Sequence, residues 1–172
     1  TSYSFFRSAY TNLQGAYIAS AWENIHVLSA QVGYKFKRNW ELGVKFRYQG
    51  GTPYSPYDSA ASRVNYLVLG NGVLDYTKVN TLRTKDFHSS DLRIDKKYNF
   101  KKTTLDFFLD ISNWYGSMTV APSAYYFSVN PDGTFKTTDG LPIKKDGSNG
   151  VPALANGNQV FITPTFGFIW EF

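Results

Sequence analysis

Asp106 and Asp110 are the closest that this chain comes to a catalytic pair of carboxylates. They stand four residues apart in a segment where apolar and polar residues alternate, a pattern typical of a β-strand. On a strand their Cα atoms lie about 13 Å apart, at ~3.3 Å per residue. Glycosidases hold their two carboxylates about 5 to 9.5 Å apart. We therefore expect these aspartates to form ion pairs rather than to act as acid and base.

The two histidines, His26 and His88, are the other residues with the chemistry to bind a metal or haem. Neither has a second histidine at ligand spacing, and the chain has no cysteine. The favoured interpretation places both where strands join loops, while a metal or haem role stays open. Asp132, Asp139 and Asp146 lack the ligand density of a calcium loop. The sequence predicts neither an enzyme nor a bound cofactor.

A compact cluster of aromatic and acidic residues comprises Tyr54, Tyr57 and Asp58. Binding residues are commonly carried on loops that a rigid scaffold positions, so these three are candidates for contact with a ligand. The alternative is structural: Pro53 and Pro56 stiffen the loop, and the tyrosines line a membrane interface. Both interpretations stay open at this point.

Six segments alternate apolar and polar residues with a period of two, which places successive side chains on opposite faces of a strand. They are residues 3–10, 28–36, 40–49, 91–100, 105–112 and 160–172. The last is longer than an ordinary strand of about five or six residues. About ten tilted residues with one apolar face are typical of a strand that crosses a membrane in a barrel. The sequence therefore predicts an all-β fold, an antiparallel segment of a transmembrane β-barrel.

The connections between these segments alternate strictly between short and long. Residues 37–39 and 101–102 form tight turns, whereas residues 11–25, 51–90 and 115–158 form long loops. All long loops therefore emerge at one end of the strands. Outer-membrane barrels have short periplasmic turns and long extracellular loops. We expect a cell outer-membrane location, with the last strand ending on the periplasmic side.

Charge complementarity predicts the register of both hairpins, because like charges opposite one another destabilise a strand pair. A two-residue turn at 101–102 places Lys97 opposite Asp106 and Arg93 opposite Asp110. In the other hairpin, a three-residue turn at 37–39, with Asn39 in the left-handed conformation, places Lys35 opposite Glu41. The charge pairs expected on the lumen wall are Lys97 with Asp106, Arg93 with Asp110, and Lys35 with Glu41.

Composition agrees with a membrane barrel. Aromatic residues make up 18% of the chain, and barrels use aromatics at both membrane interfaces. The net charge of +5 is scattered along the sequence, whereas a nucleic-acid site gathers basic residues on one surface. We expect outer-membrane lipid as a partner and no nucleic acid.

Three stretches resemble the TonB-dependent outer-membrane receptors of Bacteroidetes. They are RYQGGTPYSPYD at 47–58, SDLRIDKKYNF at 90–100 and PTFGFIWEF at 164–172. Their order and spacing are similar to those of receptors of the iron-chelate type rather than of the glycan-importing branch. The aromatic ending, with Phe168, Trp170 and Phe172, also resembles the signal that the barrel-assembly machinery reads in outer-membrane proteins.

The resemblance implies a 22-stranded barrel whose lumen holds an N-terminal plug domain, and this chain corresponds to about the last six strands, without the plug. It implies uptake of a scarce nutrient ligand: a siderophore, a cofactor, a peptide or a glycan. The implied partners are the remainder of the barrel and the plug, the TonB complex and the barrel-assembly machinery, with a surface lipoprotein or another envelope protein as a further partner.

Two other interpretations stay open. Six amphipathic strands with exposed tyrosines also fit a soluble β-sandwich that binds carbohydrate, in which a second sheet covers the apolar face. The chain also fits a barrel subunit, or a folding substrate, within a larger envelope complex.

Overall fold

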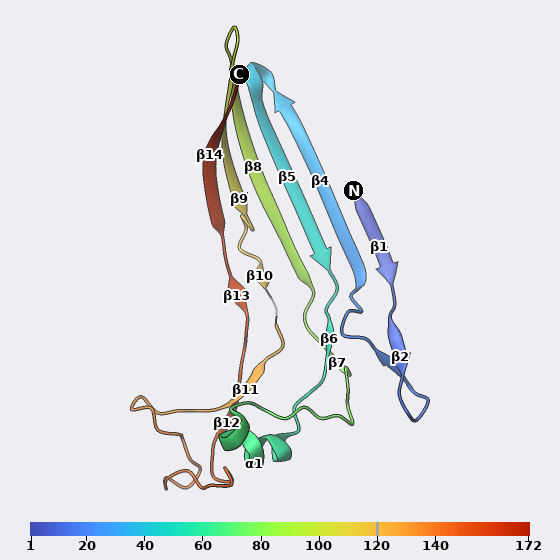
Figure 1. Ribbon diagram of the computed structural model, residues 1–172, viewed down its shortest axis with the longest axis vertical. Helices are drawn as coiled ribbons and strands as arrows, with labels where there is room; N and C mark the ends of the chain where they lie inside the picture. Colours follow the sequence, from blue (N-terminus) through green and yellow to red (C-terminus); the bar gives the residue numbers. More distant parts are fainter. Residues whose placement is uncertain (120) are drawn as a thin grey trace.

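The chain folds around one large antiparallel sheet. The computed structural model describes residues 1–119 and 121–172. Six strands form this sheet in the order β1-β4-β5-β8-β9-β14 (Figure 1). Their bounds are Ser2–Phe6, Ile25–Phe36, Trp40–Gln49, Phe87–Asn99, Thr104–Ser112 and Thr163–Glu171. The all-β, antiparallel fold is therefore confirmed, and within the described residues the sheet is open rather than closed into a barrel.

The tight turns have the predicted positions and set the predicted registers. Lys101 and Lys102 form the tip of the β8–β9 hairpin, which the Phe100 N–H closes by donating to the Thr103 carbonyl at 2.8 Å. In the other hairpin the chain turns at Lys37–Asn39, where Asn39 has the predicted positive φ of 58°. Arg38 also has a positive φ, of 62°, which was not predicted.

Two of the predicted strands are divided. The last segment is divided, because Gln159–Val160 (β13) pairs with Met118–Thr119 (β10) before β14 begins at Thr163. The first segment is divided too, into β1 and a short strand Ala9–Thr11 (β2) that pairs with Tyr17–Ala19 (β3). Alternation cannot locate such breaks, because the chain bends between strands without losing its polar and apolar pattern.

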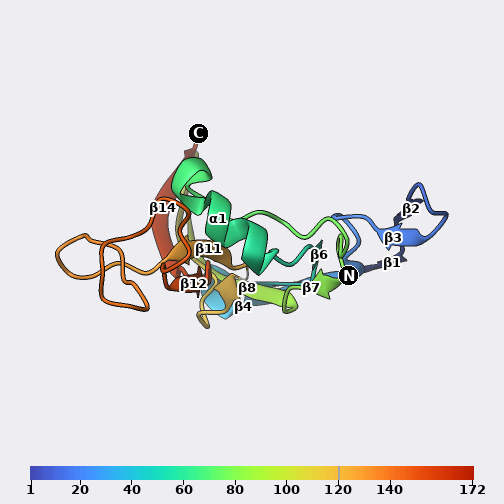
Figure 2. The ribbon, with the colours of Figure 1, turned by 90° about the horizontal axis from the view of Figure 1, so that it is seen from below.

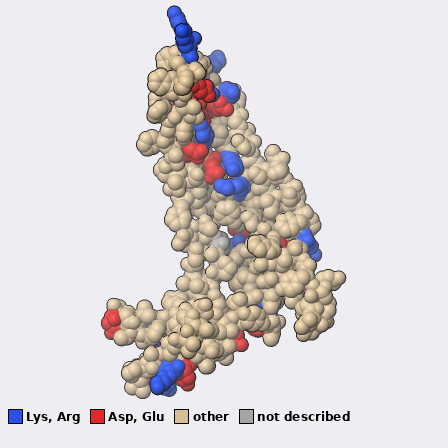
Figure 3. Space-filling model, viewed as in Figure 1, with Lys and Arg blue, Asp and Glu red and all other residues tan. Residues whose placement is uncertain are grey.

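Both faces of the large sheet lack a covering layer. One face carries apolar side chains that are strongly exposed, including Tyr34 at 63%, Phe168 at 64% and Trp170 at 63%. The opposite face carries charged and small residues, and Figure 3 shows acidic and basic side chains following one another along the sheet. A soluble sheet buries its apolar face against another layer. Here no layer of the described chain does so.

The long loops carry short elements of their own at one end of the sheet (Figure 1). These are β6 (Pro53–Tyr54), α1 (Ser59–Leu69), β7 (Leu82–Arg83), β11 (Ala124–Phe127) and β12 (Pro152–Ala155). β6 pairs with β7, and β11 pairs with β12. We call residues 52–75 and 121–155 the cap. Seen from below, α1, β11 and β12 lie together, apart from the β2–β3 hairpin (Figure 2).

The cap holds the buried hydrophobic core of the described residues. Phe127 is 1% exposed and Tyr125 is 6% exposed, and they are the two buried hydrophobic side chains found there. The Tyr66 ring of α1 lies 4.5 Å from the Phe127 ring, measured between centroids. Apolar packing therefore joins the two long loops, although they are far apart in sequence.

Candidate functional site

The predicted charge pairs on the polar face are present in two of three cases. Lys97 Nζ lies 3.6 Å from Asp106 Oδ2, and Lys35 Nζ lies 3.7 Å from Glu41 Oε2. Both pairs are direct cross-strand neighbours. They are half or more exposed on the lysine side, so each is worth at most about 1 kcal/mol in water.

Arg93 and Asp110 lie opposite one another, as the register prediction has it, but the ion pair that Arg93 forms is with Asp95. The Arg93 guanidinium instead donates to Asp95, with Nη2 2.8 Å from Oδ1 and Nε 3.0 Å from both carboxylate oxygens. Residues i and i+2 share a face of a strand, so a neighbour on the same strand competes with the cross-strand partner. The bidentate geometry that arginine prefers is available at Asp95.

The Arg93 guanidinium also stacks on an aromatic ring of the polar face. Its carbon lies 4.4 Å from the centroid of Phe108. Gly167 is opposite Phe108 in the register, and a Cβ at Gly167 would come within 2.7 Å of that ring. The Phe108 ring therefore occupies the space that a side chain at position 167 would need.

The two histidines lie apart, each beside a tyrosine. His26 Nδ1 is 2.8 Å from the Tyr3 hydroxyl, and His88 Nδ1 is 2.7 Å from the Tyr115 hydroxyl. Each histidine ring stacks on its tyrosine, with an interplanar angle of 22°. Within residues 1–119 and 121–172, no group of three or more metal-binding side chains comes together. His26 and His88 are the second residues of β4 and β8, so both lie where a long loop joins a strand, as predicted.

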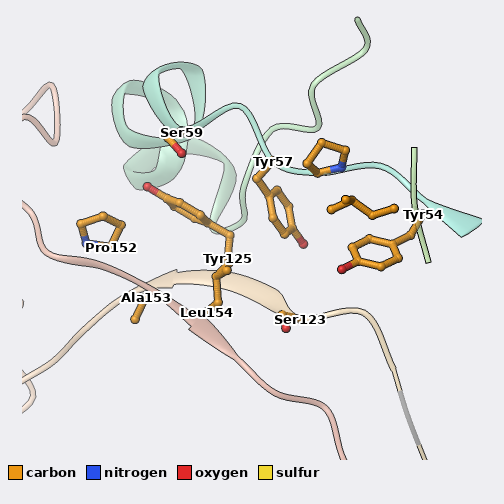
Figure 4. Close-up of a pocket in the computed structure, with 10 residues that line it drawn as sticks. Tyr54, Tyr57, Ser59, Ser123, Tyr125, Pro152, Ala153 and Leu154 are labelled. Atoms are coloured by element: carbon orange, nitrogen blue, oxygen red, sulfur yellow. The ribbon is translucent and has the colours of Figure 1, made fainter. Parts of the chain in front are cut away.

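Two of the three loop candidates line a pocket of about 350 Å³ in the cap. Tyr54 and Tyr57 come from β6 and the segment after it, and Tyr125 and Leu154 come from the paired strands β11 and β12 (Figure 4). The centroids of the Tyr57 and Tyr125 rings lie 5.7 Å apart. The volume is in the range of small-molecule sites, about 300 to 1,000 Å³.

The third candidate, Asp58, has a structural position instead. Its carboxylate accepts hydrogen bonds from the backbone N–H groups of Ala60 and Ala61, both at 2.9 Å, and so caps the N-terminus of α1. It is not among the residues that line the pocket. The ligand-contact prediction is therefore not supported for Asp58, whose side chain is used by the helix.

The pocket offers aromatic faces and hydroxyl groups, and no Asp, Glu, Lys or Arg is among the described residues that line it. Tyr125 brings a buried hydroxyl that has no hydrogen-bond partner. Burial raises the pKa of the Tyr125 phenol, so the group is a neutral donor at neutral pH. This set of groups suits a neutral ligand, or a neutral part of one, better than an anionic chelate.

Sequence reasoning missed Tyr125, Leu154 and the helix that supports the pocket. A signal for the helix was present, because Asp58 and Gly70 bracket residues 59–69 as N-cap and left-handed C-cap. No comparable signal places β11 beside β6, since that contact depends on how two long loops pack.

The remaining candidates, Phe168 and Trp170, lie on the apolar face of β14, and Phe172 follows the end of that strand. No helix in the described part of the chain is both long and apolar enough to cross a membrane. No protein-family model, curated protein or solved structure matched this chain.

Proposed function

We propose that this chain forms part of the wall and the surface loops of an outer-membrane β-barrel, in a TonB-dependent receptor that takes up a scarce nutrient. The observation that carries the proposal is the exposed apolar face of the large sheet. Burying such a face in lipid hydrocarbon removes it from water without a second protein layer.

The height of the apolar face matches a membrane. Its rows run from the level of Leu28, Tyr48 and His88 to the level of Tyr98, Leu105 and Trp170. From His88 to Tyr98 the strand advances ten residues, which is about 33 Å at ~3.3 Å per residue. A strand tilt of about 40° reduces that to about 25 Å, the height of the apolar band of outer-membrane barrels.

Aromatic residues stand at both ends of this face, as membrane interfaces favour. Trp40, Tyr98 and Trp170 lie toward the short turns, while Tyr3 and Tyr48 lie toward the long loops. The His–Tyr pairs also lie at the long-loop end of the face, because His88 is the cross-strand neighbour of Tyr48 and His26 is the cross-strand neighbour of Phe5. A sheet packed against another sheet needs no such bands.

The charged face of the large sheet, opposite the apolar face, is suited to line the lumen of a barrel. Lys97 with Asp106, Arg93 with Asp95, Arg47 with Asp91, and Lys35 with Glu41 are ion pairs there. Small residues separate them, with Gly33 and Gly43 opposite one another in the same row as Arg93. A water-filled or plug-filled interior accommodates such a wall. Within the described residues no second sheet covers the apolar face, which favours this wall over the soluble sandwich.

The receptor assignment rests on the resemblance together with the cap. The stretch at 47–58 leads from β5 into the cap pocket, the stretch at 90–100 contains most of β8, and the stretch at 164–172 contains all of β14 except Thr163. A preformed pocket at the long-loop end is where a receptor would meet an external ligand. The remainder of the barrel, the plug and the TonB complex are the partners that this proposal requires.

Protease treatment of intact cells tests the topology. We expect external protease to cut the cap while the strands stay protected, in a protein that fractionates with the outer membrane and shows heat-modifiable mobility in gels. Cutting that requires permeabilised cells would contradict the proposed orientation. For the receptor role, deleting this gene and deleting TonB should impair growth on the same scarce nutrient.

A further inference from the structure

The apolar face carries one charged side chain among the described strand residues, Lys96 of β8. Its neighbours in the row across the sheet are Phe36, Trp40, Phe107 and Phe168. None of the ion pairs in the described residues involves Lys96. On a lipid-facing surface an unpaired lysine costs about 2 to 4 kcal/mol at mid-depth and about 0 to 1 kcal/mol near the interface.

The structure shows how Lys96 is held near the interface. Its Nζ donates to the Arg38 carbonyl in the short turn. The same Nζ lies 5.2 Å from the ring centroids of both Trp40 and Tyr98, which are cation–π distances. The stem therefore lies along the apolar face while the ammonium group points toward the turns, as a snorkelling lysine does.

Apolar grooves lie on both sides of the ridge that Trp40 and Ile94 form beside Lys96. One groove, of about 470 Å³, includes Lys96, Phe107 and Phe166 in its lining. The other, of about 380 Å³, includes Phe36 and Leu42. Both are open along the face that the proposed function turns toward lipid, and Trp40 and Ile94 line both of them.

The charge at this end of the face is of one sign. Lys37 and Arg38 occupy one short turn, and Lys101 and Lys102 occupy the other. The acidic residues of these strands, such as Glu41 and Asp95, alternate onto the polar face. Glu41 also lines the smaller groove, but its carboxylate pairs with Lys35. An anionic group that approaches from the lipid side therefore meets Lys96 and the basic turns.

We propose that Lys96 and the two grooves form a binding site for a diacyl phospholipid with an anionic headgroup, in the leaflet on the short-turn side. The Lys96 ammonium pairs with the lipid phosphate, and the acyl chains lie along the grooves on either side of Trp40. This site rests on the proposed membrane-spanning function, because only then do the grooves face acyl chains.

The test is lipid competition on the full-length protein that contains this chain. The protein is reconstituted into nanodiscs of equimolar phosphatidylglycerol and phosphatidylcholine, released in the gas phase, and its retained lipids are counted by native mass spectrometry. We expect phosphatidylglycerol to be retained preferentially. Lys96→Gln should reduce that preference about fivefold, which corresponds to ~1 kcal/mol for one basic residue near an anionic surface.

Lys102→Gln is the matched control, because it removes the same charge from the same end of the molecule but outside the aromatic frame. We expect it to change the preference less than twofold. Equal loss in both variants, or equal retention of both lipids by the unmodified protein, would overturn the site. Lys96→Gln removes a charge from an apolar face, so it should insert as well as the parent. Failure of the unmodified protein to insert at all would instead contradict the proposed function.

Discussion

At the scale of single residues, the polar face shows how one absent side chain organises its neighbours. Gly167 leaves the space over which the Phe108 ring lies, and the Arg93 guanidinium lies on that ring. Arg93 is thereby held between a ring and the carboxylate of Asp95. Three residues on neighbouring strands therefore depend on the one glycine, an arrangement known from sheets in which an aromatic ring covers a glycine.

Gly167→Ala should destabilise the sheet by about 1 to 3 kcal/mol, the usual cost of overpacking, because the new Cβ would lie 2.7 Å from the Phe108 ring. The measurement is the urea midpoint of the detergent-solubilised protein. Gly33→Ala is the control, since its Cβ would meet nothing closer than 3.9 Å. Equal midpoints for the two variants would show that Phe108 moves aside without cost.

A second residue-scale prediction concerns Asp86, just before β8. The Tyr48 hydroxyl and the Gly51 N–H both donate to its carboxylate, and these bonds lower the pKa of the Asp86 carboxyl. A lowered pKa means that the folded state favours the charged form. The stabilisation is therefore present above the unfolded-state pKa and is lost as the pH falls through the lower folded-state pKa.

We expect the Gly51 amide to exchange its hydrogen faster in acid than its intrinsic rate explains. Amide exchange of the protein across the acidic range, corrected for the intrinsic pH dependence, measures this. Asp86→Asn should remove the pH dependence, because the amide does not titrate. The same acid response in Asp86→Asn would assign the effect to another group.

At the scale of elements, the strands were predictable and the cap was not. The period of two located β4, β5, β8 and β9, and opposite charges such as Lys97 and Asp106 fixed the hairpin register, because both signals lie within a few residues along the chain. Arg93 pairs with Asp95 rather than with Asp110 because Asp95, on the same face of the same strand, allows bidentate hydrogen bonding. The register alone does not predict this. The pocket depends on Tyr57 meeting Tyr125, and no local pattern encodes that meeting.

For the strands of the large sheet, the cost of a charged side chain is expected to depend on how deep in the bilayer the residue lies. Val32 lies in the middle rows of the apolar face, and Phe36 lies in the Trp40 row toward the short turns. Val32→Arg should cost about 2 to 4 kcal/mol in a lipid bilayer and Phe36→Arg about 0 to 1 kcal/mol for the charge, in addition to the lost ring at Phe36. Folding titrations in phospholipid vesicles measure both costs. Costs that do not change with depth would contradict a bilayer around this face.

At the scale of the whole molecule, wall and cap are stabilised by different means. The large sheet is held by backbone pairing and its apolar face is exposed within the described residues, whereas the cap has a small core of its own around Phe127 and Tyr125. Gly147 and Gly150 approach this core closely, since a Cβ at Gly150 would lie 2.6 Å from the Phe127 ring. The pocket is thus built on a packed unit rather than on free loops.

Phe127→Ala should therefore unfold the cap while leaving the wall intact. Replacing a fully buried phenylalanine costs about 3 to 5 kcal/mol, more than so small a core can lose. We expect faster proteolysis of residues 121–155 with no change in heat-modifiable mobility. Val129→Ala, at a position 52% exposed, should change neither. Loss of the heat-modifiable form in Phe127→Ala would mean that the cap and the wall fold as one unit.

Arg83 joins three segments at a seam where the large sheet leads into the loops that carry the cap. Its guanidinium donates to the Glu23 and Gly51 carbonyls, at 2.8 and 2.9 Å, and pairs with the Glu23 carboxylate. Gly50 and Gly51 pass so close to Asn24 and Thr84 that no side chain fits. Because these contacts fix the path of the chain between the strands and the cap, we expect that other loops can replace the cap without a change in the strands of the large sheet.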